Sequence, residues 1–128
     1  MDKQAFQALI DEVHQTAVEH GWWADGRDKP FPELIALLHS EVSEVFESWR
    51  SGTAPTSIVY TLADDSLNYS SAKFAGYVKP DGIPVELADV IIRAMDMAAG
   101  LGIPLAQAME EKLAYNKTRS YRHGGKMA

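Results

Sequence analysis

The segment from Pro84 to Gly100, PVELADVIIRAMDMAAG, constrains the fold more than any other part of the sequence. Placed on a helical wheel, apolar residues surround most of its circumference, and what is left is one narrow polar stripe: Glu86, Asp89, Arg93 and Asp96. A helix that is apolar nearly all round is usually buried. We therefore expect neighbours on several sides of this helix, and we expect its polar stripe to face a cavity rather than bulk water.

Three more helices are predicted from apolar residues at helical spacing. The first extends from about Lys3 to His20 and stops at Gly21. The second begins near Pro30 and Pro32 and extends to about Arg50, while the fourth begins near Pro104 and continues through Asn116. The sequence thus predicts an all-α fold, a four- to five-helix bundle in a single domain of residues 1–128. One chain supplies few helices to surround the third, so we also expect oligomerisation, with a homodimer as the minimum.

The stretch between the second and third helices, residues 51–83, is expected to be a long loop insertion. It contains one plausible extended piece, SIVYTL, which could belong to a short hairpin. Loops of this length inside a compact domain are uncommon and usually have a function or are mobile.

The second helix carries acidic residues where a core would be expected. Glu41 lies inside the apolar stripe, with Leu34, Leu37, Leu38 and Val45 within about 60° of it on the wheel. Glu44 lies at the edge of the stripe, and Glu47 is expected to face solvent. A buried carboxylate without a partner costs several kcal/mol or takes up a proton. Glu41 therefore needs a partner from elsewhere in the fold. Trp49, in the apolar sector, is expected in the core.

Two interpretations of these acids remain open from spacing alone. If Glu41, Glu44, Glu86 and Asp89 face one another across two helices, they form an all-oxygen cluster of the kind that Mg²⁺ prefers. Alternatively, Arg93 neutralises Asp89 or Asp96 within its own helix, and the stripe is an ordinary salt-bridge network.

Charge is distributed unevenly along the chain. All 18 acidic residues lie in residues 1–111, whereas the last seventeen residues contain five basic residues and no acid. The net charge of −6 argues against binding to nucleic acid polymers, although the basic tail (residues 117–128) and Lys112 could grip a phosphate-bearing ligand. Without cysteine there is no thiolate chemistry. No signal peptide and no apolar run of about 18 residues is found, so we expect a cytoplasmic protein without membrane contact.

The order of the acidic motifs resembles a known family. EVSE (Glu41 to Glu44) followed by ELAD (Glu86 to Asp89) is similar to the E-x-x-E…E-x-x-D signature of the MazG-like, all-α nucleoside triphosphate pyrophosphohydrolases. The flanking sequences LIALLHSEVSEVFESWR and GIPVELADVIIRAMDMA, and the tail KLAYNKTRSYRHGGK, also resemble this family. The resemblance covers roughly residues 31–50 and 82–126. The spacer of 41 residues between the motifs departs from compact family members, so contacts made there cannot be carried over.

The resemblance implies a homodimeric or homotetrameric bundle that hydrolyses (deoxy)nucleoside triphosphates to the monophosphate and pyrophosphate, with a role in cleaning the nucleotide pool. It implies Mg²⁺, with Mn²⁺ as a possible substitute, bound by Glu41, Glu44, Glu86 and Asp89. One acid, Glu44 or Glu47, would orient the attacking water as general base. The basic residues near the end of the chain would contact the outer phosphates: Lys112, Lys117, Arg119 and Arg122.

Three further residues are candidates for substrate contact. Trp22 and Trp23 could stack on a nucleobase, although core packing or a dimer contact is the alternative for each. Asn116 either caps the last helix or touches substrate. Two rival functions also remain: a helical oligomerisation module without catalysis, and a related phosphoribosyl-ATP pyrophosphohydrolase or all-α dUTPase. A di-iron carboxylate bundle is disfavoured because it needs paired Glu-x-x-His motifs.

Overall fold

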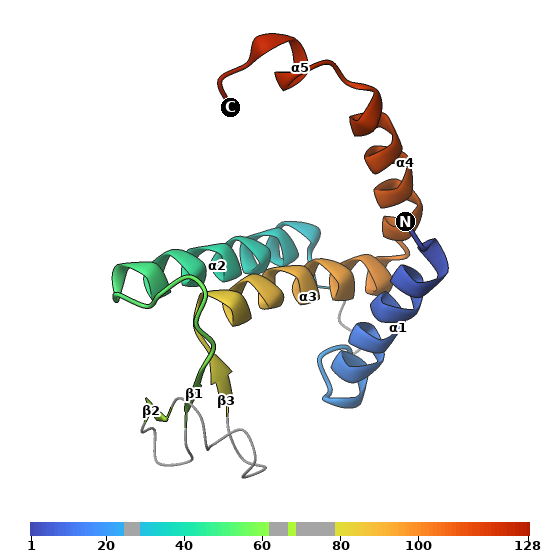
Figure 1. Cartoon of the computed structure of the whole chain (residues 1–128). Coiled ribbons are helices and arrows are strands. Elements are labelled where there is room, and N and C mark those ends of the chain that lie inside the picture. The colour runs from blue at the N-terminus through green and yellow to red at the C-terminus, as the bar shows by residue number, and fades with distance from the viewer. Residues whose placement is uncertain (25–28, 62–66, 69–78) are drawn as a thin grey trace. The chain divides into compact units, whose positions relative to one another are not determined.

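Helices dominate the structure, a computed structural model that describes residues 1–24, 29–61, 67–68 and 79–128. Its elements, shown in Figure 1, are α1 (Lys3–Glu19), α2 (Phe31–Arg50), β1 (Val59–Thr61), β2 (Leu67–Asn68), β3 (Lys79–Asp81), α3 (Ile83–Leu101), α4 (Leu105–Thr118) and α5 (Arg122–Gly125). The predicted all-α class is therefore confirmed. None of the helices in the described part of the chain is long and apolar enough to cross a membrane.

The long helices begin and end within about two residues of their predicted positions, because capping residues and turn residues fix their ends. The Asp2 carboxylate caps α1 by accepting a hydrogen bond from the backbone N–H of Ala5 at 3.0 Å. α2 has a proline in its first turn, where no backbone donor is needed. Gly21 and Gly102 follow α1 and α3 with positive φ angles of 85° and 67°.

Three short strands lie in the region between α2 and α3. They form an antiparallel sheet in the order β2-β1-β3, with Tyr60 opposite Asn68 on one side and Pro80 on the other. The predicted extended piece SIVYTL contains β1, so that expectation is confirmed. The pairing of β1 with β3 matters for the site because β3 leads directly into α3.

The chain divides into two compact units, which we describe separately. The terminal unit comprises Met1–Gly26 and Met95–Ala128, and the central unit comprises Arg27–Ala94. The α3 helix contributes its first part to the central unit and its last part to the terminal unit. The expectation of a single domain stays a prediction.

In the terminal unit, α1 packs against α4 around a small apolar core. Ile10, Met95 and Ala106 are buried at its centre, and four half-buried apolar residues surround them: Phe6, Val13, Ala99 and Leu105. Burial of these side chains stabilises the unit because each removes apolar surface from water.

The same unit contains a polar anchor built on Asp96. The indole Nε1–H of Trp23 donates to Asp96 Oδ1 at 3.0 Å, and His14 Nδ1 lies 2.8 Å from the same oxygen. The rings of His14 and Trp23 meet edge to face, with centroids 5.3 Å apart. Trp23 also packs so closely on Gly100 that any side chain at position 100 would collide with it. Asp96 therefore ties the segment after α1 to α3.

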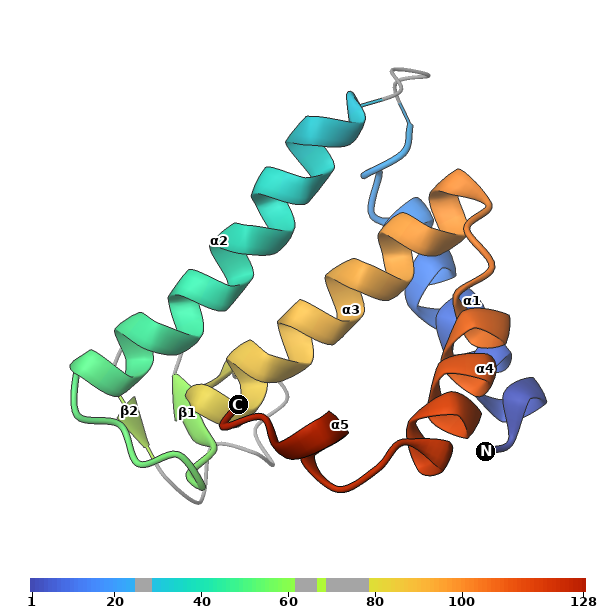
Figure 2. The ribbon, with the colours of Figure 1, turned by 90° about the horizontal axis from the view of Figure 1, so that it is seen from above.

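In the central unit, α2 and the first part of α3 run side by side in opposite directions, and the strands lie at the start of α3 (Figures 1 and 2). An apolar groove of about 470 Å³ opens on these helices, lined by Val42, Val45, Phe46, Trp49, Pro55, Ile83, Leu87 and Val90. Trp49 is 60% exposed, so the expectation that it belongs to the core is wrong for a single chain. The apolar stripe of α2 is wider than the surface that one chain covers.

Candidate metal centre

Three carboxylates from two helices converge in the central unit. One oxygen each from Glu41 and Glu44 on α2 and from Glu86 on α3 lie within 4.8 Å of one another. Glu41 and Glu86 are largely buried, with 12% of the Glu41 side chain and 9% of Glu86 exposed, whereas Glu44 is exposed. The spacing i, i+3 places Glu41 and Glu44 on neighbouring turns, and the antiparallel α3 brings Glu86 to them. The structure therefore gathers three of the four predicted ligands.

Crowding of these acids changes the protonation of Glu86. Burial is the main cause that raises the pKa of Glu86 to about 7, and the nearby carboxylates of Asp81 and Glu44 raise it further. Like charges this close repel one another unless a proton or a cation lies between them. A proton or a cation at Glu86 would therefore relieve this repulsion.

Asp89, the fourth predicted ligand, lies one turn further along α3 and is half-buried. Burial raises the pKa of Asp89, and the charges of Glu41 and Glu44 raise it too, whereas Lys79 and Arg93 act in the opposite direction. Asp89 thus lies in the electrostatic field of the cluster. Its oxygens are not among the three that lie within 4.8 Å of one another.

Arg93 crosses from α3 to α2. Its Nε–H donates to Oε1 of Glu41 at 2.7 Å, and its Nη2 atom lies 2.5 Å from the same oxygen in an ion pair. This contact explains why Glu41 is tolerated within an apolar stripe, because the guanidinium group neutralises the buried carboxylate. The hydrogen bond and ion pair of Arg93 lead to another helix rather than to Asp96, which is bonded to Trp23 and His14, although the charge of Arg93 does act on Asp89 of its own helix.

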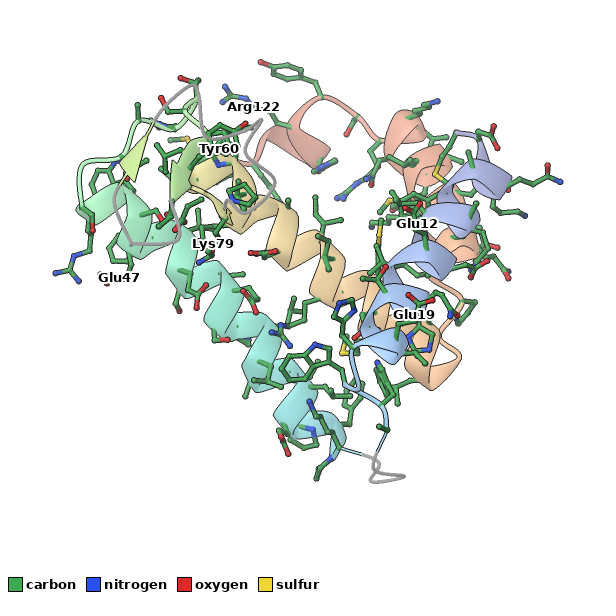
Figure 3. The ribbon with its side chains drawn as sticks, turned by 90° about the horizontal axis from the view of Figure 1, so that it is seen from below. Glu12, Glu19, Glu47, Tyr60, Lys79 and Arg122 are labelled. Atoms are coloured by element: carbon green, nitrogen blue, oxygen red, sulfur yellow. The ribbon has the colours of Figure 1, made fainter. Side chains whose placement is uncertain are left out.

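Two residues of β3 that the sequence pattern does not predict, Lys79 and Asp81, lie near the cluster. The Oδ1 atom of Asp81 accepts the backbone N–H of Gly82 at 2.8 Å, and this contact is the main reason that the pKa of Asp81 is lowered. Lys79 Nζ lies 3.7 Å from Asp81 Oδ2. Figure 3 shows Lys79 where the strands meet the two helices. Only the dipeptide Asp-Gly ahead of the third helix hinted at a turn here.

Gly82 makes this arrangement possible. Its φ angle of +100° is one that side chains rarely adopt, and a Cβ atom there would lie 2.7 Å from the carbonyl oxygen of Ser57. The close approach lets β3 turn directly into α3. Asp81 and Glu86 are therefore brought to the same end of the helix.

The chemistry of this donor set suits a hard divalent cation. The three gathered groups all offer carboxylate oxygens, and Mg²⁺ and Mn²⁺ prefer oxygen ligands over softer ligands such as sulfur. The raised pKa of Glu86, caused first by burial and then by Asp81 and Glu44, is consistent with a site where a cation would replace a proton. Glu41, Glu44, Glu86 and Asp89 remain the candidate ligands.

Glu47, the other candidate general base, has a different environment. Its Oε1 atom accepts a hydrogen bond from Arg50 Nη1 at 3.0 Å, and 63% of its side chain is exposed. Figure 3 shows Glu47 on α2, on the side away from α3. The expectation that Glu47 faces solvent is confirmed.

The candidate substrate contacts belong to the terminal unit, and their role in binding stays a prediction. Trp23 is half-buried against Asp96, whereas Trp22 is 68% exposed. The basic residues lie on α4 and beyond, and several lie against aromatic rings: Lys112 and Arg119 near Tyr115, and Arg122 near Tyr121. Asn116 and Lys117 are exposed in the last turns of α4. The backbone carbonyl oxygen of Asn116 accepts a hydrogen bond from the backbone N–H of Arg119 at the end of α4.

Comparison with known proteins gives one short similarity. The chain is 47% identical over 38 residues to a dATP/dGTP diphosphohydrolase of Cyanophage S-2L. The aligned segment is 30% of this chain and 36% of the phage protein, so the chain spans about a third of the length of the relative that it matches. No protein-family model matches the chain, and no solved structure matches it.

Proposed function

We propose that this protein hydrolyses (deoxy)nucleoside triphosphates to the monophosphate and pyrophosphate with the help of Mg²⁺, as a MazG-like pyrophosphohydrolase. The observation that carries the proposal is the convergence of Glu41, Glu44 and Glu86 from two helices. The short similarity to a dATP/dGTP diphosphohydrolase supports a nucleotide substrate. The order of the EVSE and ELAD motifs supports the same class, and we include in the proposal the role in cleaning the nucleotide pool that the resemblance implies.

The acids of the central unit would hold the cation. Glu41, Glu44 and Glu86 would supply one oxygen each, and Asp89 would add a fourth from the next turn of α3. When bound, Mg²⁺ supplies polarisation of the phosphoryl oxygens and a lowered pKa for a water molecule. Mn²⁺ is expected to replace Mg²⁺ because both prefer oxygen ligands.

Glu44 is the better candidate for the general base. It is exposed at the edge of the cluster, so a water molecule can reach it, and it lies against Glu86. Glu47 is held by Arg50 at the helix surface. A base must lie within hydrogen-bond reach of the water that it deprotonates, and Glu44 meets this condition for any water bound beside the cluster.

Phosphate binding requires positive charge in addition to the metal. Lys112, Lys117, Arg119 and Arg122 would donate charge-assisted hydrogen bonds to the outer phosphates, with Asn116 as a further polar contact. Exposed Trp22 would stack on the base. Trp23 is less suited to stacking because its ring already packs closely on Gly100 and meets the His14 ring edge to face.

The decisive experiment is a pyrophosphate-release assay over a panel of nucleotides, with Mg²⁺ and with a chelator. We expect Mg²⁺-dependent release of pyrophosphate, and loss of both activity and Mg²⁺-induced thermal stabilisation in Glu41→Gln. Glu33→Gln, an exposed acid in the first turn of the same helix, is the matched control. Release of orthophosphate, or full activity in Glu41→Gln, would overturn the proposal. The panel includes dUTP and phosphoribosyl-ATP, which separates the related enzyme classes.

Self-association is proposed as part of the same function. Phe46 and Trp49 stack on each other at the groove and are 56% and 60% exposed, and Leu87 and Ile91 on α3 are similarly exposed. Large apolar surfaces of this kind are typical of interfaces. A second copy of the chain would cover them as a homodimer or homotetramer. Sedimentation should show an oligomer that Trp49→Ser weakens, and a monomer at high concentration would contradict this part of the proposal.

A further inference from the structure

The contact between Arg93 and Glu41 suggests a role that the proposed reaction does not by itself require. The Nε–H of Arg93 donates to Oε1 of Glu41, Nη2 forms an ion pair with the same oxygen, and only 12% of the Glu41 side chain is exposed. Arginine stays charged at every relevant pH. A permanent positive charge is therefore bonded directly to one of the candidate metal ligands.

Among the residues that the structure describes, Arg93 makes the closest contact of any cation with the cluster. Its side chain is 39% exposed, its Nε–H donates to Glu41 at 2.7 Å, and its Nη2 atom lies 2.5 Å from the same carboxylate oxygen. Lys79, by comparison, is 74% exposed, and its nitrogen lies 3.7 Å from Asp81. Charges in water are screened and contribute little, whereas partly buried charges act strongly. Arg93 is therefore bonded directly to a candidate ligand, whereas Lys79 acts at longer range; both cations act to lower the pKa of Asp89, Lys79 more than Arg93.

A fixed positive charge at this place has two opposite effects. It offsets repulsion among Glu41, Glu44 and Glu86, which stabilises the fold when no divalent cation is bound. It also repels an incoming divalent cation and occupies an oxygen that the cation would use. A bound nucleoside triphosphate supplies negative charge that compensates for the repulsion between Arg93 and the cation.

We propose that Arg93 is a positioning residue that sets the affinity of the cluster for a divalent cation. It holds Glu41 in place and keeps binding of the free cation weak. The cation is then bound tightly only when the triphosphate is bound as well. This inference rests on the proposed function. It assigns to Arg93 a role in regulating metal loading, and it does not make Arg93 a catalytic group.

The test compares Arg93→Gln, Arg93→Lys and the wild type. Binding of MnCl₂ alone is measured by electron paramagnetic resonance, and thermal unfolding is followed in a chelator. We expect Arg93→Gln to bind Mn²⁺ more tightly, on the order of tenfold, because a positive charge near the ion is removed. In the chelator the same variant should unfold about 4 °C or more below the wild type. Arg93→Lys keeps the charge and should restore weak Mn²⁺ binding.

Arg50→Gln is the matched control. Arg50 pairs with exposed Glu47 on the surface of α2, so the same substitution there should change neither Mn²⁺ affinity nor the unfolding temperature appreciably. A purely structural role for Arg93 would lower stability without tightening Mn²⁺ binding. Equal or weaker Mn²⁺ binding by Arg93→Gln would therefore overturn the inference. The proposed function fails by a different result, namely absence of Mg²⁺-dependent pyrophosphate release in the wild type.

Discussion

Two acids on the same helix, Glu86 and Asp96, have opposite environments. Asp96, in the terminal unit, faces the indole N–H of Trp23 and the ring of His14. Glu86, in the central unit, faces the carboxylates of Asp81 and Glu44, and its pKa is raised to about 7. Both acids belong to one polar stripe, and their helical positions alone do not distinguish them. The difference lies in what the partner elements present.

This contrast separates an acid that serves the fold from acids that serve a site. A carboxylate surrounded by N–H donors is satisfied within the protein, and it stabilises the local structure. A carboxylate surrounded by carboxylates raises the energy of the folded state at neutral pH, and such clusters are typical of functional sites. We therefore expect substitutions in the two groups to have opposite consequences for stability.

The largest expected effect is on catalysis at Glu44. Glu44→Gln should lower the rate of pyrophosphate release by more than about a hundredfold, because it removes both a ligand and the candidate base. Glu47→Gln should lower it by less than about threefold, since Glu47 is held by Arg50 at the surface. Steady-state assays of both variants at saturating Mg²⁺ check this. Equal losses in the two variants would mean that Glu47 takes part in the reaction.

The next effect is the pH dependence of stability caused by Glu86. Its folded pKa of about 7 lies above its ordinary value of 4.5, so the folded state holds a proton that the unfolded state releases. Stability without metal should therefore be highest below pH 4.5 as far as this group is concerned, fall as the pH rises, and level off above 7. The full penalty is about 3 kcal/mol.

Removing the charge at Glu86 tests this sign. In a chelator, Glu86→Gln should be more stable than the wild type at pH 8 and nearly equal to it at pH 4.5. Urea unfolding at the two pH values measures the difference. A variant that is destabilised equally at both values would show that Glu86 is held by favourable contacts, as Asp96 is, and the contrast between the units would disappear.

The smallest expected effect concerns Asp96. Asp96→Asn keeps an acceptor for Trp23 but loses the charge that strengthens the hydrogen bonds, so we expect a destabilisation of about 1 kcal/mol. The rise in unfolding temperature caused by Mg²⁺ should be unchanged. Thermal unfolding with and without Mg²⁺ checks both statements. Loss of the Mg²⁺ effect would show that Asp96 contributes to cation binding.

The helices of this protein could be predicted because their signals are local. Prolines and glycines mark the starts and stops, and the apolar periodicity of α2 and α3 indicates which acids face inward. Glu41 was predicted to need a partner, since it lies in an apolar stripe, and the structure supplies Arg93. The all-α class followed from the same patterns.

The remaining part of the site depends on pairing between distant segments. Asp81 and Lys79 reach the cluster because β3 pairs with β1, and strands of three residues leave almost no periodic signal. Helical spacing predicts a partner for Arg93 three or four residues away on its own helix. Its long side chain instead reaches Glu41 on a different helix. The exposure of Trp49 likewise depends on how much of α2 the rest of the chain covers.

The pairing of Thr61 with Lys79 has a consequence for engineering this chain. Because these two residues are paired opposite each other in the sheet, the two points from which any connection between β1 and β3 starts and ends lie side by side. The free energy of closing a loop changes only slowly with its length. A short hairpin connection could therefore replace residues 62–78 while the junction at Gly82 and the acids beyond it stay in place, which would yield a minimal scaffold for grafting loops of other sequence.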